Sequence, residues 1–228
     1  MVSIDTVYQR VLAILNKEQR GYLPPLEFNL FANQAQMDLF EQYFYDINQF
    51  GRLHGNDTEY SDMLNILNEK INLFEKTAAM AWNGTYWVPP ADLYRIGSLL
   101  YNNIEVERIN ANEYRYIAAS PLAKPTDDRP IFVANSEGYK VYGSNEIQTT
   151  GVSCNYIKVP AKVGWAYNDV FGTAEYDVTN TVDFELHQSE ETELVFKILE
   201  LAGLAIKDVS VYQAAMQMEA QNTQQEKS

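Results

Sequence analysis

Few side chains in this sequence of 228 residues are of the types that usually carry out chemistry. It holds two histidines, His54 and His187, and one cysteine, Cys154. A nucleophilic triad needs a histidine base beside a serine or cysteine, and a structural zinc ion takes ligands that are mostly cysteine and histidine. His54 lies in a polar loop with two glycines, His187 directly precedes a predicted helix cap, and Cys154 falls within a strand pattern. Surface, capping and core roles explain these three residues, and we expect neither a triad nor a zinc site.

Two groups of acidic residues could in principle act as general acid and base or bind a cation. Asp127 and Asp128 are adjacent in a proline-rich loop and precede an arginine, which is typical of a turn with an ion pair. Glu190, Glu191 and Glu193 lie in the first turn of a predicted helix, where the helix dipole favours negative charge. The sequence contains no phosphate-binding glycine loop, EF-hand loop or metalloprotease helix. We therefore expect no catalytic residue, no metal ion and no cofactor.

The composition limits the classes of partner. A total of 31 acidic and 17 basic residues gives a formal net charge of −14, whereas nucleic-acid-binding proteins need a basic surface. Residues 175–228 hold 11 acids and 3 lysines, so we expect an acidic exposed face there. No apolar run approaches the length of about 20 residues that a membrane span requires, and residues 1–15 are amphipathic, unlike a secretory signal. We expect a protein made and used in a cytosol, without a disulfide.

Apolar periodicity predicts the helices that must carry these side chains. Residues at helical spacing predict helices over 5–19, 24–50 and about 63–79, the second of them opened by a double proline. A serine N-cap precedes a fourth helix over 190–203. A further amphipathic stretch over 210–220 leads into a glutamine-rich end.

Alternation of apolar and polar residues predicts short antiparallel strands between these helices. The strands are expected over 93–101, 104–109, 114–117, 131–133, 139–142, 146–147, 154–159 and 183–186. The first of these also fits a short helix, but a strand is favoured. A turn with a glycine makes 131–142 a hairpin, and three prolines keep the loop over 120–130 out of any ladder.

Helices and strands occur in separate blocks, which favours an α+β fold over a parallel α/β sheet. We predict an N-terminal helical hairpin or three-helix unit over 1–80 and an antiparallel β sandwich or barrel over 81–187. A C-terminal helix with a mobile tail is expected over 188–228. The three regions are expected to form one integrated domain.

The chain is rich in aromatic residues, with 16 Tyr, 10 Phe and 3 Trp, although no catalytic site is predicted. Aromatic side chains are enriched at protein–protein interfaces, and an ordinary core and surface explain only part of them. Phe31, Phe44 and Phe50 widen the apolar stripe of the second helix beyond what one packing partner needs. We predict that these three residues contribute to an interface.

The C-terminal stretch is a second predicted interface. Val211, Ala214 and Met218 share one helical face, while the glutamine-rich end has no apolar side chains to offset the cost of ordering. We expect a loose segment in the isolated subunit that docks into a groove of a neighbouring protein. Deletion of 210–228 should leave the subunit folded and weaken this docking.

Three passages of the sequence carry a family resemblance. The first is VYQRVLAILNKEQRGYLP at 7–24 with EFNLFANQAQ at 27–36. The second is SPLAKP at 120–125 with RPIF at 129–132 and YIKVP at 156–160, and the third is FELHQSEETEL at 184–194 with KILELAG at 197–203. In their order and spacing they resemble the head–tail connector, or neck ring, proteins of short-tailed bacteriophages, closest to those of crAss-like phages. The resemblance spans nearly the whole chain and departs at Gly143 and Gln188, where proline is expected in relatives.

The resemblance implies a non-enzymatic virion structural protein that forms a ring below the portal, continues the DNA channel and links capsid to tail. The implied partners are other copies of the chain in a ring, twelvefold where it seats on a portal, the portal protein, and neighbouring neck and tail ring proteins. Double-stranded DNA would pass through without specific binding, because acidic walls repel phosphate. The protein would be assembled in the bacterial host cytoplasm and stay in the neck of the virion.

Two other interpretations stay open. An intracellular binding or scaffold module would dock a protein partner through the aromatic helical face over 28–50. An acid–base enzyme would use Asp127 or Asp128. The particle size at micromolar concentration distinguishes a closed ring from a complex of two proteins.

Overall fold

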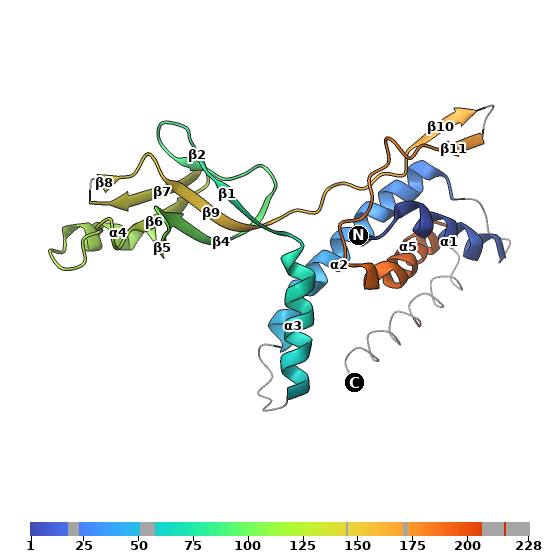
Figure 1. Ribbon diagram of the computed structural model, residues 1–228, viewed down its shortest axis with the longest axis horizontal. Helices are drawn as coiled ribbons and strands as arrows, with labels where there is room; N and C mark the ends of the chain where they lie inside the picture. The colour runs from blue at the N-terminus through green and yellow to red at the C-terminus, as the bar shows by residue number, and fades with distance from the viewer. Residues whose placement is uncertain (18–22, 51–57, 145, 171–172, 207–216, 218–228) are drawn as a thin grey trace. The chain divides into compact units, whose positions relative to one another are not determined.

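The computed structural model describes residues 1–17, 23–50, 58–144, 146–170, 173–206 and 217. Contacts divide the chain into two compact units, Met1–Leu73 with Pro160–Ser228, and Phe74–Val159. The first unit holds helices from both ends of the chain, and the second holds most of the strands (Figure 1). This combination of helices with a large, mostly antiparallel sheet confirms the predicted α+β class.

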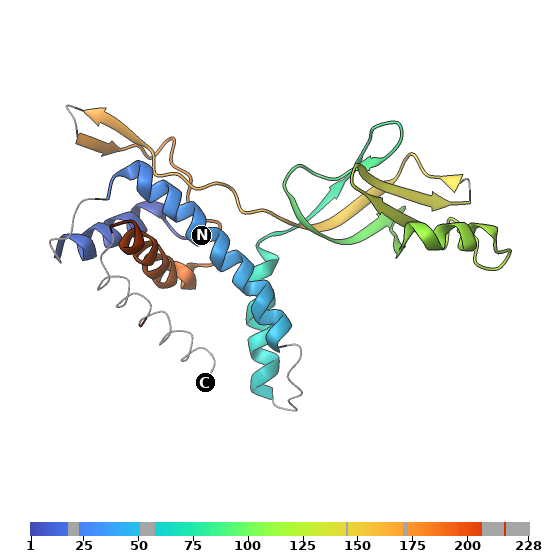
Figure 2. The same cartoon turned by 180° about the vertical axis from the view of Figure 1, so that it is seen from behind.

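The first unit is a packed group of helices. They are α1 (Ile4–Lys17), α2 (Pro25–Phe50), α3 (Thr58–Asn72), the short 3₁₀ helix η1 (Gln188–Glu190) and α5 (Glu191–Ile206). α5 packs against α1 and α2, and α3 packs against α2 (Figure 1 and Figure 2). The facing side chains are buried and apolar, among them Val7, Phe28, Leu39, Leu194 and Ile198. α5 extends past its predicted end at Gly203. That glycine is buried within the helix, which continues to Ile206.

The third helix is shorter than the sequence predicts. It ends at Asn72 instead of about Ala79, and Glu75–Ala79 forms strand β1. Helical apolar spacing continues as far as Phe74, which is fully buried. The following residues, however, pair one by one with β9 (Val152–Lys158). Pairing with this distant segment outweighs the local helix propensity.

The second unit is a small barrel. Its strands are β1, β2 (Ala81–Trp82), β3 (Trp87–Val88), β4 (Leu93–Tyr101), β5 (Ile104–Ile109), β6 (Ile131–Asn135), β7 (Gly138–Gly143), β8 (Glu146–Ile147) and β9. They are hydrogen-bonded in the order β1-β9-β4-β5-β6-β7-β3-β2, with β8 beside β7. β1 and β2 are consecutive parts of one run, separated only by Met80, yet they occupy the two ends of this order. The sheet therefore closes on itself, with antiparallel pairing except between β5 and β6.

The barrel interior is a continuous apolar core. Its buried members are Met80, Trp87, Leu99, Tyr101, Val106, Phe132, Val141, Val152, Cys154 and Tyr156. Trp82 packs on Trp87 with ring centroids 5.4 Å apart. Full burial of one large apolar side chain contributes roughly 1.5–3 kcal/mol, so this cluster dominates the stability of the second unit.

The strand predicted around Tyr114 and Ile117 is instead helix α4 (Ala111–Ala119). Asn110 precedes the helix in an extended conformation, and its backbone amide donates to Glu113 Oε2 at 3.4 Å. An asparagine followed three residues later by a glutamate is a helix-start signal that the strand assignment overlooked. Tyr114 and Ile117 lie three residues apart, so one face of the helix can pack both against the buried apolar cluster on β5 and β6.

Two predicted strand features in the second unit are confirmed. The hairpin over 131–142 is formed by β6 and β7, paired from Ile131 with Tyr142 to Asn135 with Gly138. Gly138 has a φ of 143°, a conformation that favours glycine. The strand over 93–101 is β4.

The predicted last strand over 183–186 is wrong. Among the described residues it forms a single isolated bridge, between Val2 and Phe184. Its alternating burial reflects packing on the helices instead of membership of a sheet. The sequence prediction also missed a short antiparallel hairpin of β10 (Tyr167–Val170) and β11 (Thr173–Tyr176) in the first unit.

A charged cluster joins three parts of the barrel. The ammonium of Lys76 on β1 lies 3.0 Å from Asp92 Oδ2, and the hydroxyl of Tyr156 on β9 donates to Asp92 Oδ1 at 2.8 Å. The hydrogen bonds from Lys76 and Tyr156 hold the pKa of Asp92 below its ordinary value of 3.8.

We expect Asp92→Asn to lower the melting temperature at neutral pH and to have little effect in strong acid. Because the pKa of Asp92 is lower in the folded state, its ionised form stabilises the fold above the unfolded-state pKa, and this contribution is lost as the pH falls through the folded-state pKa. Thermal unfolding followed by circular dichroism across this range measures the effect. Asp128→Asn, at an exposed loop position, is the control. A difference between Asp92→Asn and wild type that does not change with pH would contradict the prediction.

Candidate functional site

The predicted interface residues fall partly within the described structure. Phe31 and Phe44 lie on α2 and are both partly buried. Phe44 packs edge-on against Phe40, with ring centroids 5.1 Å apart. The remaining residues of the prediction lie outside the described side chains: Phe50, Val211, Ala214 and Met218. The two described phenylalanines thus give much of their surface to packing within the first unit.

Other residues form the exposed apolar surface of α2. Leu26 and Leu30 keep 67% and 70% of their surface accessible, and they lie on one face because they are four residues apart. Tyr45, towards the other end of the helix, is also exposed. The buried stripe of α2 includes Phe28 and Ala32, so the two leucines fall outside it. Apolar residues outside the main stripe of a helix are the sequence signal that would have found this surface.

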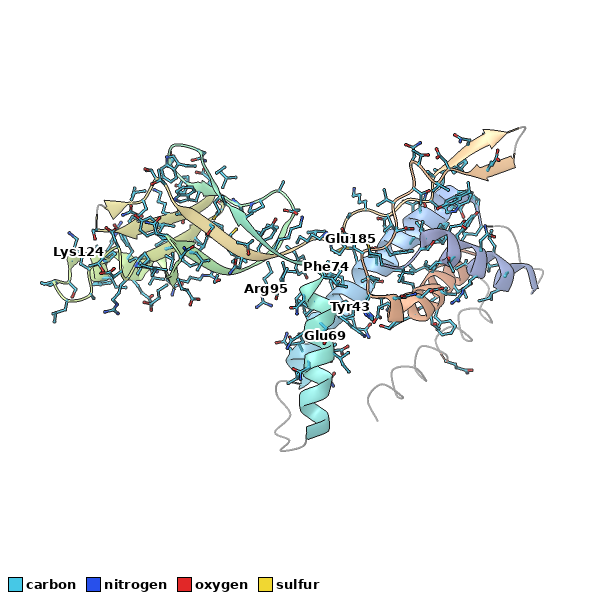
Figure 3. The ribbon with its side chains drawn as sticks, in the orientation of Figure 1. Tyr43, Glu69, Phe74, Arg95, Lys124 and Glu185 are labelled. Carbon is cyan, nitrogen blue, oxygen red and sulfur yellow. The ribbon has the colours of Figure 1, made fainter. Side chains whose placement is uncertain are left out.

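The second unit also exposes large apolar side chains. Tyr116 on α4 is 81% exposed, and Leu122 in the following loop is 95% exposed. Lys124 marks this loop in Figure 3. Each unit therefore carries its own exposed apolar side chains.

A row of side-chain amides on α2 binds an extended backbone segment of the first unit. Asn33 Nδ2 donates to the carbonyl of Val163 at 2.8 Å, and the Val163 amide donates to Asn33 Oδ1 at 3.0 Å. Asn29 makes the same reciprocal pair with Trp165, at 3.2 and 2.8 Å. Each asparagine thus takes the place that a neighbouring strand would have in a sheet.

Gln36 continues this row and adds a third segment to it. Its Nε2 donates to the carbonyl of Ala161 at 2.8 Å, and its Oε1 accepts from the amide of Glu185 at 3.2 Å. The carboxylate of Glu185, labelled in Figure 3, accepts from the amide of Ala161 at 2.9 Å. We call Asn29, Asn33 and Gln36 the amide row. Their spacing of four and three residues places them along one side of the helix.

The indole of Trp165 joins this segment to α1 and to the base of the β10–β11 hairpin. Its ring centroid is 4.7 Å from that of Tyr8, and it stacks with Tyr167 and Tyr176 at 5.9 and 5.4 Å. Its Nε1 donates to Asp5 Oδ1 at 2.9 Å. The hairpin is therefore fixed at its base by aromatic packing.

Asp127 holds the proline-rich loop to the barrel. Its Oδ1 accepts from the Ser144 amide at 2.9 Å and from Gln148 Nε2 at 3.3 Å, and its own amide donates to the Ser144 hydroxyl at 3.0 Å. Gln148 is buried, and its Oε1 and carbonyl accept from the Tyr101 hydroxyl and Trp87 Nε1, both at 2.9 Å. These contacts give Asp127 a structural role.

The glutamates at the start of α5 take part in separate ion pairs. Buried Glu190 lies 2.6 Å from Lys70 Nζ and accepts from the Ser189 hydroxyl at 3.2 Å. Glu191 lies 2.9 Å from Arg10. Among the residues that the structure describes, no three His, Cys, Asp or Glu side chains are placed to share a metal ion.

The three residues considered for a triad are not brought together in the described structure. Nδ1 of His187 accepts from the Ser189 amide at 3.3 Å and caps η1, as predicted. Cys154 is fully buried in the barrel, where burial raises the pKa of its thiol. His54 lies outside the described residues.

No protein-family model matches the chain, and no curated protein matches it. Within the described ranges, no helix is both long and apolar enough to cross a membrane. The features that remain for a functional argument are the exposed apolar side chains and the amide row.

We expect Asn33→Ala to lower the free energy of unfolding by about 2–3 kcal/mol, because it leaves the amide and carbonyl of Val163 without their partner. Asn48→Ala is the matched control, since its amide donates only to the preceding turn at an exposed position, and it should cost at most about 0.5 kcal/mol. Urea unfolding of both variants measures the difference. Equal effects would show that the amide row contributes little.

We expect Gly143→Ala to destabilise the second unit by about 1–3 kcal/mol, the usual range for overpacking. A Cβ there would lie 2.6 Å from Asp127 Oδ1 and from Gln148 Nε2, so the network that holds the loop must shift. Gly164→Ala should be nearly neutral, because a Cβ there meets no atom within 4 Å. Thermal unfolding measures both changes, and an unchanged Gly143→Ala variant would overturn the argument.

Proposed function

We propose that this chain is a non-enzymatic virion structural protein that forms a ring in the head–tail connector below the portal. The ring continues the DNA channel and links the capsid to the tail. Its partners are further copies of the chain, the portal protein and neighbouring neck and tail ring proteins. In this proposal the protein assembles in the host cytoplasm and remains in the neck of the virion.

The observation that carries the proposal is that each of the two units exposes large apolar side chains of its own. Leu26 and Leu30 are exposed on α2 of the first unit, and Tyr116 and Leu122 are exposed on the second. A head-to-tail contact joins two different surfaces of the same chain, and such contacts generate rings when the rotation closes. The exposed apolar side chains of the two units could supply two such different surfaces.

The passages that carry the family resemblance also support the proposed function. The amide row lies in the passage 27–36, Ala161 directly follows the passage 156–160, and Glu185 lies in the passage 184–194. These passages meet through hydrogen bonds within the first unit. The resemblance therefore rests on residues that hold this fold together.

The charge of the chain also supports this function. A net charge of −14 repels the DNA backbone, so packaged DNA could slide past the ring without being held.

The test is to image the purified full chain by negative-stain electron microscopy, alone and with portal protein, and to measure its mass in solution. We expect closed rings, twelvefold on the portal. Leu30→Glu should weaken ring formation by about tenfold or more, because it removes the burial of a leucine side chain. Gln49→Glu, an exposed change of the same charge near the other end of the same helix, is the control.

Other outcomes would exclude the proposal. A protein that stays monomeric with and without portal is not a ring component. A complex with a single copy of another protein, lost in Leu30→Glu, would instead support a binding or scaffold module that docks its partner through α2.

A further inference from the structure

An apolar groove lies between α1 and α5 of the first unit. Its volume is about 280 Å³, and its apolar lining consists of Ala13 and Ile14 from α1 and Val195 and Phe196 from α5. Ala13 is exposed, and Ile14 keeps 39% of its surface accessible. An apolar cavity of about 150 Å³ holds a benzene-sized group, so this groove has room for one or two apolar side chains.

The polar lining of the groove does not call for a charged occupant. Arg10 Nη1 lies 2.9 Å from the carboxylate of Glu191, so its charge is already paired. Thr192, the other polar residue of the lining, is uncharged. The groove therefore suits an apolar face.

The amphipathic stretch over 210–220 carries such a face. It lies outside the described residues except for Gln217, which is helical and exposed. Val211, Ala214 and Met218 recur at the spacing by which an amphipathic helix lies in an apolar groove, and none of them is charged. Gln217 falls outside this face, because successive residues of a helix are about 100° apart. Its exposure is what a helix with its apolar face against the groove requires.

The chain that follows α5 is long enough to bring this face to the groove. α5 ends at Ile206, and residues 207–209 separate it from the stretch. A connection of about two to five residues is typical of two antiparallel helices. α5 is about 15 Å long from Ile206 back to Phe196, and a helix over 210–220 is about 16 Å long. A helix that turns back along α5 thus brings Met218 to within about one turn of Phe196.

The short connection also favours the groove of the same copy over that of a neighbour. A segment tethered by a few residues is present at its own groove at an effective concentration on the order of millimolar. The groove of another copy in free solution competes only at protein concentrations of that order.

We propose that residues 210–220 form a helix that covers the groove between α1 and α5 of the same copy, with Met218 beside Ile14 and Phe196. This contact needs no second copy and so does not depend on the proposed ring. It differs from the contact predicted from the sequence, in which the segment docks on a neighbouring protein. Any partner that uses the same groove has to displace the segment first.

Hydrogen exchange of the full chain at micromolar concentration tests the contact. We expect the amides of residues 211–218 to exchange at least about tenfold more slowly than in a free peptide of the same sequence, because so short a helix is not stable alone. Ile14→Asp places a charge in the groove and should remove this protection. Ile66→Asp, at an exposed isoleucine of α3, is the matched control and should keep it. Circular dichroism checks that both variants remain folded.

Two results of this experiment would overturn the proposal. One is exchange of 211–218 in the wild-type chain as fast as in the free peptide. The other is protection that persists in Ile14→Asp.

Disulfide cross-linking gives an independent test. A chain with Ile14→Cys and Met218→Cys should form an internal disulfide, seen as a monomer of altered mobility on a non-reducing gel, with a yield that does not change on dilution. Ile14→Cys with Gln217→Cys is the control, and it should cross-link at least about fivefold more slowly because Gln217 is exposed. The native Cys154 is buried and should not compete.

The outcomes of cross-linking separate the alternatives. Equal rates for the two cysteine pairs would contradict the contact. A disulfide that forms between mixed single variants as fast as within the double variant would place the segment in a neighbour's groove and overturn the same-copy contact. Rings on the portal with 211–218 unprotected would disprove this contact alone. A protected segment in a chain that stays monomeric with and without portal would disprove the proposed function alone.

Discussion

The first unit depends on the hydrogen bonds between the amide row of α2 and the extended segment around Val163. An extended backbone needs partners for its amides and carbonyls, and here a neighbouring backbone segment supplies them only at Gly164, which bridges to Val182. Asn29, Asn33 and Gln36 supply them from a helix. Because Gln36 also binds Glu185, the same helix fixes the chain that leads into η1 and α5. Helices from the two ends of the sequence thus become one unit.

The second unit depends on a different constraint, the closure of its sheet by the run of β1 and β2. The two ends of the strand order belong to one continuous stretch of chain, which pairs with β9 through β1 and with β3 through β2. Within this sheet β4 has two register irregularities against β9 and pairs with β5 only over Leu99–Tyr101.

The sequence predicted the elements whose signal is local. α1 and α2 follow from apolar periodicity, and the β6–β7 hairpin follows from alternation around a glycine turn. Glu75–Ala79 and the segment around Phe184 were assigned wrongly, because distant partners decide whether such residues become a strand. The amide row was missed for another reason: an asparagine in a helix looks like an ordinary surface residue until its backbone partner is known.

The nesting of one unit inside the other has a consequence for how the chain folds. The barrel lies between the two halves of the first unit in the sequence, and its ends are joined by a hydrogen bond of 2.9 Å from the Lys158 amide to the Phe74 carbonyl. Closing a flexible loop of the barrel's length costs on the order of 4 kcal/mol in chain entropy. If the barrel folds first, its own folding brings the two ends together, and this entropy is no longer lost when the helices associate. The N-terminal helices then pack on the C-terminal ones as if a short turn connected them. This favours a folding order in which the barrel forms first and the helical unit second.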